Sequence, residues 1–190
     1  SMDLAKLDTS ACKNFQDTFF GLESLESLIL SDWDTGSAQN LSCMFQNCYS
    51  LRSLDISGWD TSSVYNFFGL LYSCSSLTEI EFGPSFTTAN AWNISSMFGL
   101  CASLENLDVS NWDLSSATDT SRMFYGCSSL RFLDVSAWNT SNVTKMSGAF
   151  GSMSYGMFGN CPNLTADCSN WDVEKVTDHT CFNLNSPGVT

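Results

Sequence analysis

Tryptophan recurs along this chain at a spacing that restricts its fold more than any other feature. Trp59 follows Trp33 by 26 residues, Trp138 follows Trp112 by 26, and Phe86 stands where a tryptophan is expected between Trp59 and Trp112. The whole column reads Trp33, Trp59, Trp112, Trp138 and Trp171. A unit of this length cannot bury a hydrophobic face alone, but stacked copies can, so the period predicts a solenoid.

A cysteine column has the same period and precedes a leucine by three residues. Its members are Cys48, Cys74, Cys101, Cys127 and Cys161. We expect these five to be free thiols inside the stack, where cysteine behaves as a small hydrophobic residue. Four cysteines lie off the column and are the better candidates for disulfides, particularly Cys168 with Cys181; the other two are Cys12 and Cys43.

The most regular unit, residues 121–146, predicts the local structure. Leu133 and Val135 alternate with polar residues as in a half-buried strand, while the spacing of Met123, Phe124 and Cys127 favours a short helical turn. The expected fold class is therefore an α/β repeat solenoid of the leucine-rich-repeat type. It would have a parallel β-sheet with one strand and one short helical turn in each coil of about 26 residues.

The chain as a whole, residues 1–190, is expected to form a single solenoid domain of six to seven coils. The first and last coils are degenerate, and the long step from Trp138 to Trp171 predicts an inserted loop near residues 149–157, around 151–156. The opening Ser1-Met2 looks like the remnant of a cleaved tag, so we expect a fragment of a longer protein.

The repeat M-F-x-x-C-x-S-L-x-x-L-D-[VI]-S-x-W-[DN]-T-S-x-V, spanning roughly residues 3–182, resembles a known family. It is similar to the 26-residue repeat of bacterial surface lipoproteins of mycoplasmas, lactobacilli and Listeria, which is grouped with the BspA-like leucine-rich-repeat surface proteins. The resemblance implies a solenoid on a cell surface, used in adhesion, and it supplies no catalytic residues. Related repeats also occur in protists and algae.

The charge balance restricts the partners. Seven basic against twenty acidic residues give a formal charge of −13, which argues against nucleic acid and anionic membranes as partners. No apolar run is long enough to span a membrane. The acidic balance suits a basic partner, a bound cation or simple solubility.

One acidic column is expected to point outward from the sheet, one carboxylate in each coil. Stacked at this spacing, the carboxylates should repel and raise each other's pKa, unless salt screens them or cations bridge them. With the aromatic Phe132 on the same face, the candidate binding residues are Asp55, Glu81, Asp108, Phe132 and Asp134. No cofactor is predicted other than calcium, for which the ligands would be Asp55, Glu81, Asp108 and Asp134.

A second column directly follows the tryptophans and is expected to cap turns through its side-chain oxygens. It consists of Asp34, Asp60, Asp113, Asn139 and Asp172. The one histidine, His179, has no motif around it that would indicate catalysis.

We therefore expect a non-enzymatic, adhesion-type interaction module at an extracellular or cell-surface location. It would present a rigid acidic sheet face to a protein or glycan partner on another cell or surface. The alternatives are a structural stalk and a calcium-dependent adhesion module. Binding is expected where the repeat is irregular, at residues 81–91 with Gly83-Pro84 and at the insertion.

Overall fold

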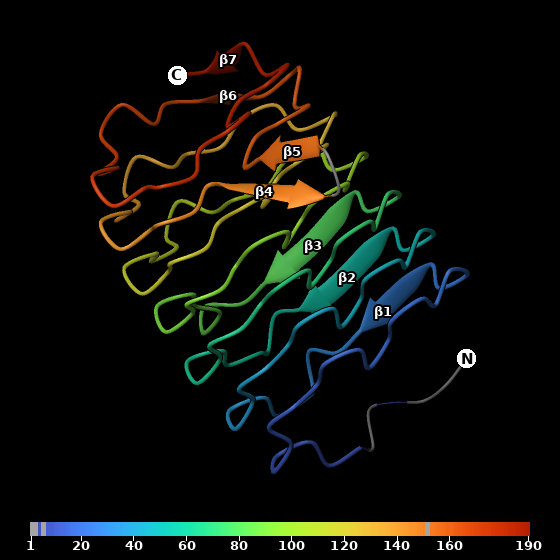
Figure 1. Cartoon of the computed structure of the whole chain (residues 1–190). Helices are drawn as coiled ribbons and strands as arrows, with labels where there is room; N and C mark the ends of the chain where they lie inside the picture. The colour runs from blue at the N-terminus through green and yellow to red at the C-terminus, as the bar shows by residue number, and fades with distance from the viewer. Residues whose placement is uncertain (1–3, 5–6, 151–152) are drawn as a thin grey trace.

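The computed structural model describes residues 4, 7–150 and 153–190, which wind into a stack of similar coils (Figure 1). A ladder of single parallel bridges joins one residue of each coil to the next along the whole described stack. Its rungs are Asn14, Asn40, Asn66, Asn93, Asp119, Lys145 and Asp178. The arrangement is that of a repeat solenoid, as the spacing of the tryptophans predicts.

Short parallel strands occupy one side of the stack. β1 (Ser27–Ile29), β2 (Ser53–Ile56) and β3 (Glu79–Phe82) form one sheet in that order, in a register that shifts by one repeat per strand. Leu54 and Ile56 point into the core while Ser53 and Asp55 point outward. Further along, β6 (Thr165–Ala166) pairs in parallel with β7 (Gly188–Val189), and Phe132 bridges to Thr165.

The expected helical turn is wrong, since no described residue is helical. In its place each of the first five coils has a run of linked tight turns, the turn ribbon, at residues 15–22, 41–48, 67–74, 94–101 and 120–127. Successive amides alternate: Thr18 N–H bonds Phe15 C=O within the turn, whereas Phe19 N–H bonds Met44 C=O of the next coil. A helix would use every amide internally, but these turns leave every second one for the neighbouring coil.

This alternation requires left-handed backbone at two positions per ribbon, four residues apart. In the first three coils these positions are Asp17 and Gly21, Cys43 and Asn47, and Gly69 and Ser73, all with φ near +60 to +70°. Gly, Asn and Asp tolerate this conformation best. The sequence of each ribbon is therefore partly a selection for left-handed turns.

The core consists of the predicted columns. All five column tryptophans are at most 8% exposed, and the five column cysteines are fully buried. Phenylalanine rings stack between coils, with Phe98 and Phe124 centroids 5.7 Å apart and Phe124 and Phe158 5.6 Å apart. Each coil therefore buries its apolar face against its neighbours.

Polar groups of these buried columns also bond between coils. The column thiols donate to a carbonyl of the preceding coil at 3.0–3.2 Å. The indole of Trp59 donates to Leu30 C=O at 2.9 Å. The column cysteines and Trp59 thus meet the requirement that a buried donor finds an acceptor.

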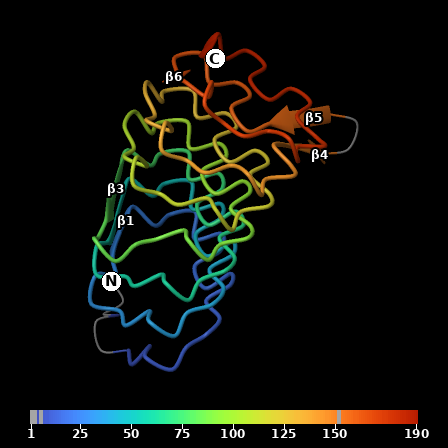
Figure 2. The same ribbon diagram turned by 90° about the vertical axis from the view of Figure 1, so that its left-hand side faces the viewer.

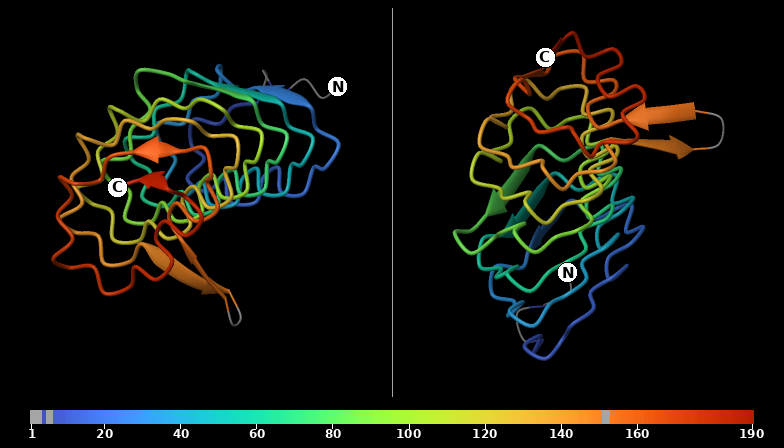
Figure 3. Two further views of the ribbon diagram at one scale, coloured as in Figure 1. Left: turned by 90° about the horizontal axis from the view of Figure 1, so that it is seen from above. Right: turned by 60° about the vertical axis from the view of Figure 1, so that its left-hand side comes forward.

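The insertion forms an antiparallel hairpin, where the sequence predicts a loop. Its strands are β4 (Ser147–Phe150) and β5 (Met153–Gly156), and residues 151 and 152 of the predicted loop lie outside the described residues. The hairpin projects from the side of the turn ribbons (Figure 2). Figure 3 shows the coils crowded on that side and spread on the opposite side, where β1–β3 lie. No helix among the described residues could cross a membrane.

Candidate functional site

The strand face is interrupted after β3. Residues 105–109 of the next coil occupy the place of a fourth strand, yet no backbone hydrogen bond joins them to residues 79–82. They associate instead with the coil that follows, where Arg131 N–H donates to Glu105 C=O at 3.2 Å. The side chains of the same two residues form an ion pair at 3.0 Å. The face is thus divided into two parts.

Backbone crowding on one side of the interruption explains where it falls. A Cβ at Gly58 would overlap the carbonyl of Ser31, and one at Gly83 would overlap the carbonyl of Ser57. Only glycine therefore permits the first three coils to approach so closely at this corner. The next coil has Asn111 directly before its tryptophan, where Gly58 precedes Trp59, and its side chain cannot enter the same space.

Phe82 fills the resulting gap from inside. Its ring centroid lies 4.5 Å from that of Phe86 and 5.6 Å from that of Trp112. The smaller Ile56 and Val109 occupy the corresponding place in the neighbouring coils. A phenylalanine at this point keeps the two coils apart while preserving apolar contact between them.

A hollow of about 450 Å³ opens here, and we call it the strand-face cleft. Phe82, Phe86 and Trp112 contribute its aromatic surface, and Trp112 is only 4% exposed. Polar groups surround the rings. The cleft is lined by Ile80, Glu81, Phe82, Gly83, Pro84, Phe86, Asn106, Leu107, Asp108, Asn111 and Trp112.

Two of the five predicted binding residues, Glu81 and Asp108, line this cleft from opposite sides. Asp55 lies beside Glu81 in the sheet register. Asp134 and Phe132 belong to the coil beyond Asp108, and Phe132 is 61% exposed. The structure therefore does not arrange the five as one continuous row, because the cleft divides them.

The expected rise in the pKa of the acidic column is wrong. Asp134 Oδ1 accepts hydrogen bonds from the hydroxyl and the N–H of Ser136, at 2.6 and 3.1 Å, and these bonds lower the pKa of Asp134. Serines at the equivalent position, two residues after each aspartate, act in the same way: Ser57 lowers the pKa of Asp55, and Ser110 lowers that of Asp108. Hydrogen bonds to the charged form outweigh the repulsion between exposed carboxylates.

Glu81 is the exception in this column. Its longer side chain accepts no hydrogen bond from any described residue, and the residue two positions on is Gly83, which has no hydroxyl. Asp55, Asp108 and Asp134 cap turns, so turn capping explains part of the reason that aspartate recurs in this column. Glu81 leaves both carboxylate oxygens available to a partner.

The residues that the structure describes can be compared with the expected metal site and the expected disulfide. No group of three or more His, Cys, Asp or Glu side chains there could hold a metal ion. All nine cysteines are free, so Cys168 and Cys181 are not bonded. Burial raises the pKa of Cys168 to about 12 and that of Cys43 to about 11.

The column after the tryptophans caps turns as predicted. Its side-chain oxygens accept the N–H two residues on, at 2.8–3.1 Å, in all five cases. Sequence reasoning missed the next residue, a buried threonine whose hydroxyl donates to a carbonyl of the following coil. It does so at Thr35, Thr61, Thr88 and Thr140.

The cleft residues Phe82, Asn106, Asn111 and Trp112 were also not recognised as site residues. The available signal was the 27-residue step from Trp59 to Phe86, one longer than the repeat. That step marks where the coils fall out of phase. It does not reveal which side chains then line the gap.

One described protein family matches most of the chain. The family described as "Mycoplasma protein of unknown function, DUF285" matches residues 1–101 and 84–155. The chain belongs to the DUF285 family. Its two matches overlap, as expected when one family description covers several copies of a repeat. No curated protein matches this DUF285 chain.

Proposed function

We propose that this DUF285 chain is a non-enzymatic, adhesion-type interaction module that uses the strand-face cleft to bind a protein or glycan partner. The observation that carries the proposal is the pairing of Glu81 and Asp108 across an aromatic-lined hollow. The hollow lies where the repeat departs from its period. Elsewhere on the strand face, most polar side chains serve turns of the repeat itself.

The chemistry of the cleft suits two kinds of ligand group. Carboxylate and amide groups bond sugar hydroxyls, and carboxylates also pair with lysine and arginine. Aromatic rings such as Phe82 and Trp112 offer apolar contact beside those polar groups. Because buried aromatic residues hold both walls, little ordering is required on binding.

Two further observations support the partner class and the location. The formal charge of −13 favours partners without strong negative charge. The resemblance to BspA-like leucine-rich-repeat surface proteins favours an extracellular or cell-surface setting. A rigid stalk remains the alternative within that setting, and it would not require the cleft.

Titration of tryptophan fluorescence tests the proposal, since Trp112 lines the cleft. The probes are a panel of neutral oligosaccharides and an oligolysine peptide. We expect saturable binding by one class and a loss of at least tenfold in affinity for the double variant Glu81→Gln, Asp108→Asn. Asn retains the oxygen that caps Ser110, so this variant removes charge from the cleft without removing the turn.

The matched control is Asp134→Asn, which removes an equivalent charge outside the cleft. It should leave the affinity unchanged. Equal binding by the wild type and the double variant would reject the cleft as the site. The calcium-dependent alternative predicts a higher melting temperature in millimolar calcium than in chelator.

A further inference from the structure

One edge of β3 faces the strand-face cleft, because β3 is the outer strand of its sheet (Figure 1). On its other edge β3 pairs with β2, and Glu79 N–H donates to Arg52 C=O at 3.1 Å. The backbone groups of alternate residues in a strand bond to opposite neighbours. Since Glu79 bonds toward β2, the backbone groups of Ile80 and Phe82 face the cleft.

This edge of β3 has no strand beside it in the described part of the chain. In a regular coil, the N–H groups of Ile80 and Phe82 would donate to carbonyls of residues 105–109. No such bond forms, and the N–H groups of Asn106 and Asp108 on the opposite wall have no acceptor among the described residues either. Unpaired N–H and C=O groups along a strand are a template for another strand.

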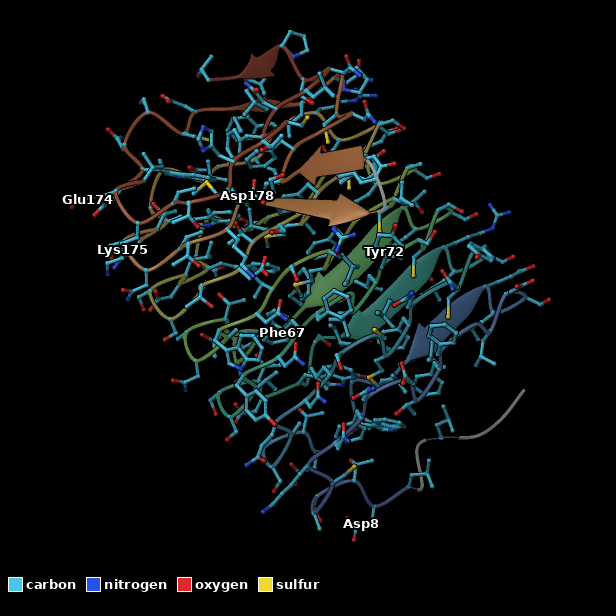
Figure 4. All side chains as sticks on the ribbon, viewed as in Figure 1. Asp8, Phe67, Tyr72, Glu174, Lys175 and Asp178 are labelled. Carbon is cyan, nitrogen blue, oxygen red and sulfur yellow. The ribbon has the colours of Figure 1, made fainter. Side chains whose placement is uncertain are left out.

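The unpaired edge is internal to the stack and is held in place by its surroundings. Coils lie on both sides of it, and the turn ribbon joins them, as where Leu71 N–H donates to Met97 C=O at 2.9 Å. Behind the cleft, the ring centroid of Phe86 lies 5.7 Å from that of Phe67, which Figure 4 labels. The edge is therefore displayed in a fixed position before any partner binds.

The cleft carries negative charge without a basic side chain beside it. Glu81 and Asp108 line it, and none of the described residues in its lining is lysine, arginine or histidine. Glu81 accepts no hydrogen bond from any described residue. Asp108 accepts both bonds from Ser110 through Oδ1, which leaves its second oxygen available. The complementary group is a lysine or arginine side chain.

Side chains alternate along β3, and this sets the pattern of a matching partner. Ile80 and Phe82 are half-buried and point toward the core, whereas Glu81 is exposed and points outward. An extended peptide beside β3 would alternate in the same way. Its inward side chains would contact the rings of Phe82 and Trp112, and its outward ones would lie beside Glu81 and Asp108. Alternating apolar and basic residues fit this edge.

We propose that the strand-face cleft binds an extended basic peptide segment of a partner protein, which adds to the free edge of β3 as a further strand. This inference rests on the proposed function and narrows its partner from a protein or glycan to a peptide strand. The peptide backbone bonds Ile80 and Phe82, and its basic side chains pair with Glu81 and Asp108. A glycan can offer hydroxyls to the carboxylates, but only a peptide repeats N–H and C=O at the spacing of β3.

The charge of this edge disfavours pairing with the β3 edge of a second copy. Glu79 and Glu81 are both exposed, and such pairing would bring them close to the same residues of the other molecule. The formal charge of −13 opposes self-association further. A basic peptide is attracted instead, and its affinity should fall as NaCl screens that attraction.

The test compares the end-blocked peptide Lys-Val-Lys-Val-Lys with the same peptide N-methylated at every residue. The two carry equal charge, but the residues of the second have no backbone N–H to pair with β3. Titration of tryptophan fluorescence should show saturable binding of the first and binding of the second that is weaker by about tenfold or more. Equal affinities would overturn strand addition and leave the proposed function intact.

Ile80→Pro makes the matching change in the protein, since proline removes the N–H that faces the cleft and is tolerated at a strand edge. It should weaken binding of the unmethylated peptide by about tenfold, whereas the control Ile80→Val keeps the N–H and should bind as the wild type does. Circular dichroism and melting temperature confirm that both variants are folded. Equal binding by the two variants would contradict the role of this edge.

Amide hydrogen exchange gives a readout that requires no variant. The peptide should slow exchange at Ile80 and Phe82, whose N–H groups face the cleft, and leave Glu79 unchanged because it already bonds Arg52. This measurement replaces Ile80→Pro if that variant fails to fold. Unchanged exchange at both Ile80 and Phe82 in the presence of saturating peptide would overturn the proposal.

The remaining outcomes separate this inference from the proposed function. Neutral oligosaccharides that bind at the cleft, with no binding of the peptide, would reject the peptide partner and retain the proposed function. Peptide binding that is equal in the wild type and in the double variant Glu81→Gln, Asp108→Asn would reject the cleft, and with it both proposals. Absence of binding by either class of probe would also reject both.

Discussion

The coil that holds β3 and the coil that follows it are joined on one side and separated on the other. On the turn side, four ribbon amides donate across, from Phe67, Gly69, Leu71 and Ser73. On the strand side, no backbone hydrogen bond connects residues 79–82 to residues 105–109. The turn ribbon therefore maintains the stack, which leaves the strand face able to open without loss of the fold.

This difference teaches where variation is tolerated in such a repeat. The ribbon bonds require regular left-handed turns in every coil. The strand face accepts Phe82 and Asn111 in place of smaller residues because the ribbon still holds the coils together. The most effective tests therefore compare the closed half of the strand face with the opened half.

The largest effect is expected from Trp59→Ala. The fully buried ring lies in the closed half, and its indole donates to Leu30 C=O, so removal should cost about 3–5 kcal/mol in the free energy of unfolding. Trp112→Ala should cost less, because that ring borders the cleft and makes no indole hydrogen bond with the described residues. Urea denaturation measures both, and an equal or larger loss at Trp112 would contradict the comparison.

Gly58→Ala should come next. Its new methyl group would collide with Ser31 C=O and force β2 away from β1, at a cost of about 1–3 kcal/mol. Ala137 holds the same place before Trp138 in the opened half, so Ala137→Gly should cost only about 0.5–1 kcal/mol, from backbone entropy. Chemical denaturation of the pair tests this, and a neutral Gly58→Ala would remove our reason for the interruption.

On the turn side, Asn66→Ala should cost about 1 kcal/mol. Asn66 belongs to the bridge ladder, and its side-chain oxygen accepts Phe68 N–H at 3.0 Å. Asn66→Asp keeps the acceptor and serves as the control. The melting temperature should fall for the alanine variant and change little for the aspartate variant, and the reverse order would count against the cap.

The smallest effect concerns acid stability. The Ser136 bonds hold the pKa of Asp134 below its usual value, so they stabilise the fold above about pH 4 and that stabilisation is lost as pH falls through the lowered pKa. Asp134→Asn keeps the acceptor but does not titrate. Its melting temperature should therefore fall less than that of the wild type between about pH 5 and 2. If the melting temperatures of the wild type and Asp134→Asn fall in parallel with pH, the stabilisation by these bonds does not depend on the charge of Asp134.

Some of the fold and site was accessible from the sequence because it depends on local pattern. Trp59, Cys74 and Leu54 repeat with the coil and are buried, and Asp60 caps its turn as its position indicates. Asp134 faces outward as strand alternation predicts, but the expected rise in its pKa is wrong, because Ser136, two residues on, donates two hydrogen bonds to its carboxylate. The alternation was real, but it did not distinguish a displayed carboxylate from a capping one.

Glu81 and Asp108 were identified as binding candidates from their column, but their grouping was not. They face each other across the cleft because Gly58 and Gly83 bring earlier coils together while Asn111 keeps the next coil away. Such spacing depends on contacts between residues about one repeat apart. A single column of residue types does not contain it.

The sequence alone determined the period, the register of the strands and the identity of the core columns, because these follow from which residues repeat and which of them avoid water. Tertiary structure decided that Met123, Phe124 and Cys127 lie in a run of linked turns and not in a helical turn. Both conformations suit the same local spacing, and hydrogen bonds to the neighbouring coil select the turns. It also decided where the strand face opens, since that depends on how closely two backbones can approach.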